Sequence, residues 1–166
     1  NSIQLLMQFI EKERNVGIVA PHLLNTNGTF QSSCYKFPTV CTELLDTLFV
    51  GYFIDIHSPF NQNQSNEVRV LDSVSGAALL FHASLVDKLG YILDEELFWS
   101  EDLDLCFRTH NQTNMLVYYY PEAKIIHHLS KSAKQNYRIP IVNQMLSRIK
   151  FFQKHHHKII WLFIIL

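Results

Sequence analysis

Residues 2–20 read Ser-Ile-Gln-Leu-Leu-Met-Gln-Phe-Ile-Glu-Lys-Glu-Arg-Asn-Val-Gly-Ile-Val-Ala, and this stretch decides the class of fold. In its first half, apolar residues recur at helical spacing behind Ser2, which can cap a helix. The β-rich run from Val16 to Ala20 follows directly and is closed by Pro21. We therefore expect a helix that leads into a buried strand.

The alternation of helix and strand continues along the chain. Asn27-Gly28 predicts a tight turn, and Gly90 is the usual residue for the left-handed cap after a helix. Further helices are expected at 42–54, 84–89, 101–110 and from Pro140. Strands are expected at 68–74, 77–81, 115–120 and 124–127. A corner is expected at 121–123 and an exposed polar loop at 61–66. This alternation predicts an α/β fold: a layered, mostly parallel sheet with helices on both faces.

The composition is that of a folded domain with one core. The chain has 166 residues, of which 48% are hydrophobic and 17% charged, and this excludes a disordered tail, a collagen and a disulfide-stabilised mini-protein. Its formal net charge is −1, so we expect no nucleic acid partner, because polyanion binders carry excess positive charge. Cys34, Cys41 and Cys106 lack the spacing of a zinc knuckle and favour a reducing compartment.

The two ends of the sequence differ in character. No secretory signal is visible at the start, and the chain begins in mid-pattern, which suggests a fragment. All charged residues after Glu122 are basic, so we divide the chain into a domain at 1–130 and a tail at 131–166, made of a basic amphipathic helix and an apolar segment.

The apolar end of the tail, 159–166, is too short to cross a bilayer, which takes about 20 residues. An interfacial anchor, a span cut by the fragment boundary and a last core segment remain open as interpretations. The basic residues before it favour an anionic membrane surface as a partner.

The densest chemical cluster is Glu101-Asp-Leu-Asp104, at the expected start of a helix. Three carboxylates within four residues repel one another, and the helix dipole offsets only part of that repulsion. Glu101 and Asp104 share a helical face while Asp102 points to one side, so they need not serve one site. The cluster is either a solvated acidic first turn or a site for a cation or a proton transfer.

Histidines form two further groups. His127-His128 closes an expected strand, in which successive side chains face opposite ways, so one at most enters a given pocket. The run 155–157 has lysine neighbours and no acidic partner in the sequence, which favours a solvated surface over a metal site.

Several motifs, taken in order, resemble the second half of the family 2 glycosyltransferases, and most closely their rhamnosyltransferase-like bacterial branch. The motifs are Val74-Ser-Gly-Ala-Ala-Leu-Leu80, Gly90-Tyr with Asp94-Glu95 and Phe98, Glu101-Asp-Leu-Asp-Leu-Cys106 with Arg108, and Tyr120-Pro-Glu-Ala-Lys-Ile-Ile-His-His128 with Ser130. Residues 1–28 also look like the helix, strand and turn that follow the family's donor-site aspartates. The resemblance covers residues 1–155.

This resemblance implies a GT-A fold and the inverting transfer of a sugar from a nucleotide-sugar to a hydroxyl of a glycan or lipid-linked acceptor, in bacterial surface polysaccharide synthesis. Asp102 would be the general base, Glu101 and Trp99 would lie at the acceptor pocket, and Ser75-Gly76 would shape its wall. His127 would help to bind a divalent cation, Mg²⁺ or Mn²⁺, at the diphosphate. The enzyme would act peripherally at the cytoplasmic face of the inner membrane.

The sequence also departs from the family pattern. Gly90-Tyr-Ile stands where members usually have Gly-Gly-Phe, and Ser100 stands where many have Gly. The nucleotide-binding strands and the D-x-D motif would precede Asn1, so we expect residues 1–166 to be inactive alone.

Two other classes of function stay open on the sequence. One is a metal-dependent hydrolase with Glu101, Asp102, Asp104 and His127 as ligands, although carboxylates on two faces of one helix make a compact metal site awkward. The other is a non-catalytic membrane-surface module built on 131–166.

Overall fold

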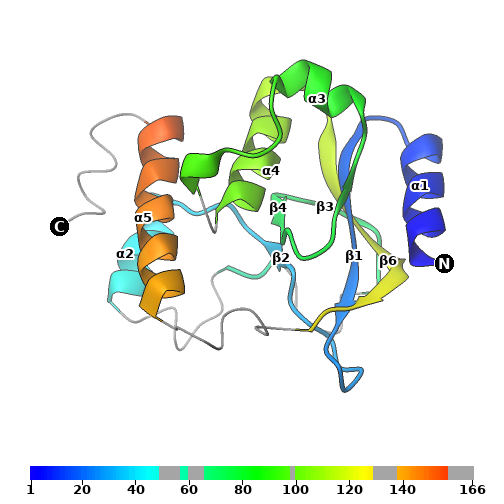
Figure 1. The fold of residues 1–166 in the computed structure, drawn as a ribbon, viewed down its shortest axis with the longest axis horizontal. Helices are drawn as coiled ribbons and strands as arrows, with labels where there is room; N and C mark the ends of the chain where they lie inside the picture. The colour runs from blue at the N-terminus through cyan, green and yellow to red at the C-terminus, as the bar shows by residue number, and fades with distance from the viewer. Residues whose placement is uncertain (49–56, 60–65, 98–99, 129–137, 157–166) are drawn as a thin grey trace.

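A computed structural model of the chain describes residues 1–48, 57–59, 66–97, 100–128 and 138–156. Its centre is a four-stranded sheet in the order β3-β6-β1-β5, with helices on both faces (Figure 1). The strands of this sheet are β1 (Val16–Leu24), β3 (Arg69–Leu71), β5 (Leu80–Phe81) and β6 (Leu116–Ile126); a second, two-stranded sheet pairs β2 (Cys34–Tyr35) with β4 (Ser73–Val74). The helices are α1 (Ser2–Lys12), α2 (Val40–Thr47), α3 (Ser84–Leu89), α4 (Glu101–Gln112) and α5 (Arg138–His155), with a 3-10 turn, η3 (Glu95–Leu97). The predicted mixture of helices and strands, with helices on both faces, is confirmed.

The main sheet is mixed, so the prediction of a mostly parallel sheet was wrong. β1 and β6 run parallel, whereas β5 pairs with β1 and β3 pairs with β6 in antiparallel fashion. A parallel pair needs a long crossover connection, and the order of elements along the chain does not say which strands become neighbours. Both neighbours of β1 come from far along the sequence.

The core lies on both faces of the sheet. On one face, Leu6 and Phe9 of α1 pack against Val16 and Val19 of β1. On the other face, a larger cluster joins β1 and β6 to α3 and α4; it includes Ile18, Val74, Leu85, Leu105, Cys106 and Val117. A Cβ on Gly17 would lie 2.7 Å from the Thr109 Cγ2, so this glycine lets α4 approach β1 closely.

A third cluster attaches α5 to the rest of the domain. Phe151 and Phe152 of α5 are fully buried and pack with Leu97 of η3 against Leu103 and Phe107 of α4. Figure 1 shows α5 beside α4, on the side of α4 that faces away from the sheet. The spacing of Ile141, Met145, Ile149 and Phe152 predicts one apolar stripe on this helix. Phe152 is buried but Met145 is 65% exposed, so the buried face of α5 differs from that stripe.

Several local predictions are confirmed. The helices at the start of the chain, at 84–89 and at Glu101 are present, and Gly28 and Gly90 both adopt positive φ. At the start of α1, however, the cap is Asn1, whose Oδ1 accepts from the Ile3 N–H, while Ser2 donates to the carbonyl of Lys124 in β6.

The prediction that strands end at Pro21 and Pro121 was wrong. β1 continues through Pro21 to Leu24, and β6 is one strand rather than two. Pro21 lies opposite Tyr120 and His22 opposite Lys124, so residues 121–123 form a bulge. A proline is tolerated at such an irregularity, because no ladder hydrogen bond is needed there.

The predicted strand 68–74 is divided into two. β3 pairs with β6 in the main sheet, and β4 pairs with β2 in the small sheet. Residues 61–65 of the predicted loop 61–66, most of the second half of the predicted helix 42–54 and the apolar run 159–166 lie outside the described residues. Within the described ranges, no helix is both long enough and apolar enough to cross a membrane.

Candidate functional site

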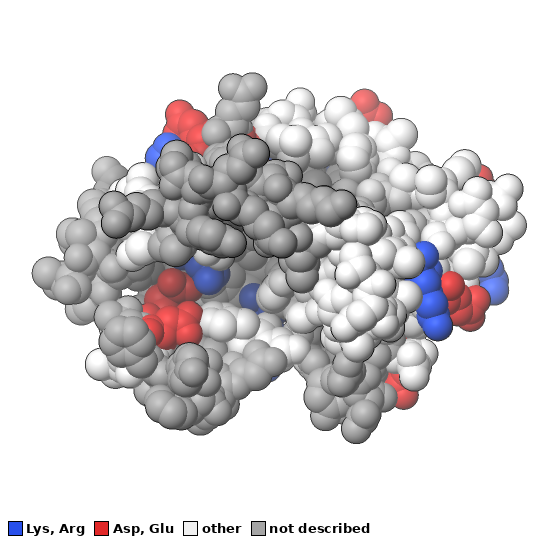
Figure 2. All heavy atoms as spheres, turned by 60° about the horizontal axis from the view of Figure 1, so that its bottom comes forward, with Lys and Arg blue, Asp and Glu red and all other residues white. Residues whose placement is uncertain are grey.

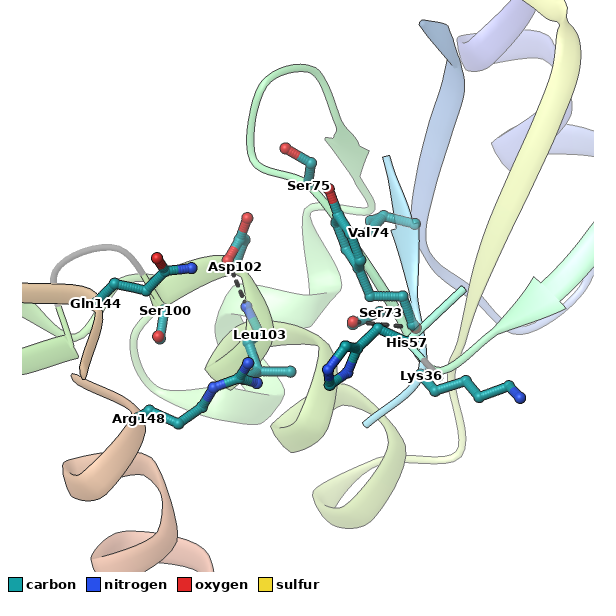
Figure 3. Close-up of a pocket in the computed structure, with 11 residues that line it drawn as sticks. Lys36, His57, Ser73, Val74, Ser75, Ser100, Asp102, Leu103, Gln144 and Arg148 are labelled. Carbon is teal, nitrogen blue, oxygen red and sulfur yellow. Dashed lines mark hydrogen bonds between the residues drawn. The ribbon is translucent and has the colours of Figure 1, made fainter. Parts of the chain in front are cut away.

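A cavity of about 410 Å³ lies between the first turn of α4, the β2–β4 ribbon and α5 (Figure 3). Its lining is mostly polar: Tyr35, Lys36, His57, Ser73, Val74, Ser75, Ser100, Asp102, Leu103, Gln144 and Arg148. The fold therefore brings one of the predicted site residues, Asp102, to a concave surface. It also brings Ser75 of the predicted wall to the same place.

The Asp102 carboxylate is held by backbone N–H groups. Its Oδ2 accepts from the Gly76 N–H at 2.7 Å, and its Oδ1 accepts from the Leu103 N–H at 2.8 Å. Gly76 follows β4, whose pairing with β2 fixes the position of this donor. A Cβ on Gly76 would lie 3.4 Å from the Asp102 Cβ, so this backbone comes into van der Waals contact with the aspartate.

Burial dominates the electrostatics of Asp102. Desolvation raises the pKa of its carboxyl group, and the nearby charge of Glu101 acts in the same direction. The N–H donors of Gly76 and Leu103 lower this pKa, but by less, so the pKa of Asp102 is raised. Burial, together with the charge of Asp102, also raises the pKa of Tyr35. The cavity thus contains a carboxylate with increased proton affinity and a phenol that keeps its proton.

Arg148 supplies positive charge to another part of the same cavity. Its Nε lies 3.5 Å from Glu43 Oε1, while the Nε2 of His57 lies 2.7 Å from Asp46 Oδ2. Figure 3 shows the guanidinium group of Arg148 beside Leu103, with the His57 ring nearby and the Lys36 side chain directed away from the group. Burial raises the pKa of Glu43 more than the charge of Arg148 lowers it.

Asp104 has a different role from Asp102, although only two residues separate them. It is fully buried, and its carboxylate binds the Arg108 Nε at 2.7 Å, the His155 Nε2 at 2.6 Å and the Lys154 Nζ at 2.9 Å. Burial would raise its pKa, but the hydrogen bonds from His155, Lys154 and Arg108 outweigh burial and lower the pKa to about 2. This network fastens α5 to α4.

The same network extends to the loop that precedes η3. Arg108 donates to the carbonyl groups of Tyr91 and Ile92 and lies 4.2 Å from the Tyr91 ring centroid, while Lys154 also binds Asp94 at 2.6 Å. The motif Asp104-x-x-x-Arg108 therefore positions the helices around the cavity and does not line it.

The remaining predicted site residues lie elsewhere or outside the description. Glu101 is half-buried and does not line the cavity, and its Oε2 has no hydrogen-bond partner among the described residues. Trp99 lies outside the described residues. His127 follows β6, where its Nδ1 lies 2.9 Å from the Gln31 Nε2, and the next residue, His128, is exposed.

Within the described part of the chain, no group of three or more His, Cys, Asp or Glu side chains could hold a metal ion. The hydrolase site with Glu101, Asp102, Asp104 and His127 as common ligands is therefore not formed, because Asp104 is already bound to Arg108, Lys154 and His155. His127 by itself does not make a cation site either. The expected Mg²⁺ or Mn²⁺ stays a prediction.

The tail predictions need correction at two residues. His155 was expected on a solvated surface, but only 7% of its side chain is exposed and it binds Asp104. Lys154 was expected among the membrane-facing lysines, but it points inward to Asp94 and Asp104. Lys150 is exposed. The face drawn in Figure 2 shows isolated acidic and basic groups and no broad basic surface over its described residues.

Sequence reasoning missed much of the cavity lining. Four lining residues carry no motif of their own: Tyr35, His57, Gln144 and Arg148. They share a cavity with Asp102 because the β2–β4 ribbon, the segment at His57 and α5 come together beside α4 (Figure 3). The sequence did show the basic residues of α5, but their spacing alone could not show which of them turn inward.

The chain was compared with known proteins in three ways. No family model, no curated protein and no solved structure matches it.

Proposed function

We propose that this chain forms the acceptor side of an inverting glycosyltransferase of GT-A type, in which Asp102 is the general base. The observation that carries the proposal is the Asp102 carboxylate: it lines a cavity, its pKa is raised, and two backbone N–H groups fix its direction. The resemblance of the ordered motifs around it to family 2 glycosyltransferases supports the same assignment.

The chemistry of such a transfer needs a base in this setting. A sugar hydroxyl is a weak nucleophile at neutral pH, and a carboxylate that takes its proton during attack contributes about 10²–10⁴-fold to the rate. A base works best when its pKa is close to the working pH, and burial moves the pKa of Asp102 in that direction. Ser75, Ser100 and Gln144 supply hydroxyl and amide groups of the kind that bind sugar hydroxyls.

In this proposal, the acceptor is a glycan or a lipid-linked sugar, and the donor is a nucleotide-sugar. No donor site is assigned to the described residues. Attachment to an anionic membrane surface, at the cytoplasmic face of a bacterial inner membrane, is proposed as part of the same function. The exposed Lys150 is one described residue that could contribute to it.

The test is a transfer assay on the full-length gene product with a panel of nucleotide-sugars and of soluble and lipid-linked acceptors. We expect formation of a glycosylated acceptor together with nucleoside diphosphate, and loss of both in Asp102→Asn. The matched control is Asp87→Asn, because Asp87 is an exposed aspartate of α3.

Two outcomes would replace this proposal. Release of free sugar without any acceptor product would favour a hydrolase. Vesicle binding that Asp102→Asn leaves unchanged, together with no transfer from any donor in the panel, would favour a membrane-surface module.

A further inference from the structure

We propose that the cavity binds an acceptor with one negatively charged group, which Arg148 holds while a hydroxyl of the same molecule lies at Asp102. This inference rests on the proposed function and adds the chemical class of the acceptor to it: a sugar bearing a carboxylate or a phosphodiester.

The first observation is that Arg148 is only weakly engaged by the residues that the structure describes. Its ion pair with Glu43 joins Nε and Oε1 at 3.5 Å, whereas the buried pair of Arg108 and Asp104 closes to 2.7 Å. A guanidinium group has five N–H donors in a planar arrangement. Because Arg148 lines the cavity, donors that face it can reach a ligand in the cavity.

The second observation is the number of positive charges that face the cavity. Lys36 is exposed and its side chain points away (Figure 3), and His57 is bonded to Asp46. Arg148 is therefore the main cation of this cavity among the described residues. Asp102 and Glu43 stand nearby, so a diphosphate with several negative charges is disfavoured. One carboxylate or phosphodiester matches one guanidinium group, which can bind it through two parallel hydrogen bonds.

The third observation is that Arg148 and Asp102 line one cavity without forming an ion pair among the described contacts. Asp102 is bonded to Gly76 and Leu103, and Arg148 faces Glu43. An acidic sugar offers both groups a partner at once: its hydroxyl can donate to Asp102 and its anionic group can accept from Arg148. The cavity volume of about 410 Å³ lies within the range of about 300–1,000 Å³ that is usual for small-molecule sites.

The test compares each acidic probe with a neutral partner of nearly the same shape, by calorimetric titration of the full-length gene product. The probes are the methyl glycosides of glucuronic and galacturonic acid against their methyl esters, and glucose 6-(methyl phosphate) against its neutral triester, glucose 6-(dimethyl phosphate). We expect at least one acidic probe to bind about ten-fold tighter than its neutral partner, as is typical of charge-assisted hydrogen bonds. The carboxylate and phosphodiester pairs distinguish the two sources of the charge.

Variants of Arg148 and of its neighbours locate the effect. Arg148→Gln should reduce the ratio of the two affinities to about one, and Arg148→Lys should leave an intermediate ratio, because lysine keeps the charge but loses the planar arrangement of donors. Glu43→Gln should increase the ratio, since it removes a competing carboxylate. Lys88→Gln, at an exposed lysine of α3, should leave the ratio unchanged. Thermal unfolding of each variant checks that it is folded.

The inference is overturned if no acidic probe is preferred, or if Arg148→Gln keeps the preference. It is also overturned if Arg148→Gln weakens the binding of UDP by as much as that of the acidic sugars, because Arg148 would then serve a diphosphate. A failure of the proposed function would look different. Asp102→Asn would then keep full turnover, while the tighter binding of the acidic probes would still depend on Arg148.

Discussion

Replacing the two aspartates of the α4 first turn one at a time separates a chemical role from a structural one. Asp102→Asn should reduce transfer by about 10²–10⁴-fold, because an amide cannot accept the proton of the attacking hydroxyl. Its effect on folding should be small. The amide oxygen keeps one of the two N–H donors, of Gly76 and Leu103, and loss of the other costs about 1 kcal/mol, while removal of a buried charge acts in the opposite direction.

Asp104→Asn should instead destabilise the fold strongly and affect turnover only through that structural change. The variant leaves Arg108, whose side chain is 1% exposed, and Lys154 and His155 without their common carboxylate. Breaking a buried ion pair by removing one partner costs about 3–5 kcal/mol. Because the same carboxylate fastens α5 to α4, we also expect Arg148 and Gln144 to shift away from the cavity, so that turnover falls as a consequence of the structural change.

The measurement is denaturant unfolding of both variants beside the transfer assay, at a pH near neutrality. The expected pattern is near-normal stability with little turnover for Asp102→Asn, and a large loss of unfolding free energy for Asp104→Asn. Equal losses of stability in both variants would refute the division of roles. Normal turnover in Asp102→Asn would remove that residue from the role of base.

The other predictions concern pH and packing. The pKa of Asp104 is lowered to about 2 from a usual 3.8, so this carboxylate stabilises the native state above about pH 4. About 2 kcal/mol of unfolding free energy should be lost as the pH falls from about 4 to about 2. Asp104→Asn should therefore show a flatter acid unfolding curve. The raised pKa of Asp102 predicts that turnover falls on acidification with a midpoint above the usual value for aspartate; a flat pH profile down to pH 4 would contradict it. Gly17→Ala should lower the unfolding free energy by about 1–3 kcal/mol, because the new Cβ would meet Thr109 at 2.7 Å. Gly28→Ala is the comparison: its new Cβ meets open space, so its only cost is the backbone strain of a positive φ.

Local patterns of the sequence predicted the elements that need only local information. The helix at residues 2–12 and the Gly90 cap follow from spacing and backbone preference, and the position of Asp102 beside Ser75-Gly76 agrees with the motifs that carry the resemblance. Strand direction could not be predicted, because β1 acquires both of its neighbours from distant parts of the chain.

The role of α5 at the site also could not be predicted from local sequence patterns. Its basic residues and apolar stripe are typical of a helix at a membrane surface, and nothing local distinguishes an inward lysine from an outward one. Lys154 turns inward because Asp94 and Asp104 are both there to receive it, and each belongs to an element far away in the sequence. Arg148 enters the cavity on the same helix, so the packing that contradicts the membrane interpretation of Lys154 is also what completes the cavity.

The two aspartates of α4 show why adjacent, chemically identical residues can serve different ends. Both carboxylates are withdrawn from water, which raises the pKa of each. Asp102 receives compensation only from neutral N–H donors, so burial prevails and the group keeps its affinity for a proton. Asp104 is bound by the cationic side chains of Arg108 and Lys154 and by a hydrogen bond to His155, which together prevail over burial and hold it ionised. The charge of the hydrogen-bond donors, rather than their number, thus separates the pKa values of the two aspartates, and that charge comes from Arg108 of α4 itself and from Lys154 of α5. Arg108 and Lys154 together make Asp104 a fixed anchor, whereas Asp102 keeps the raised pKa that the proposed role of base requires.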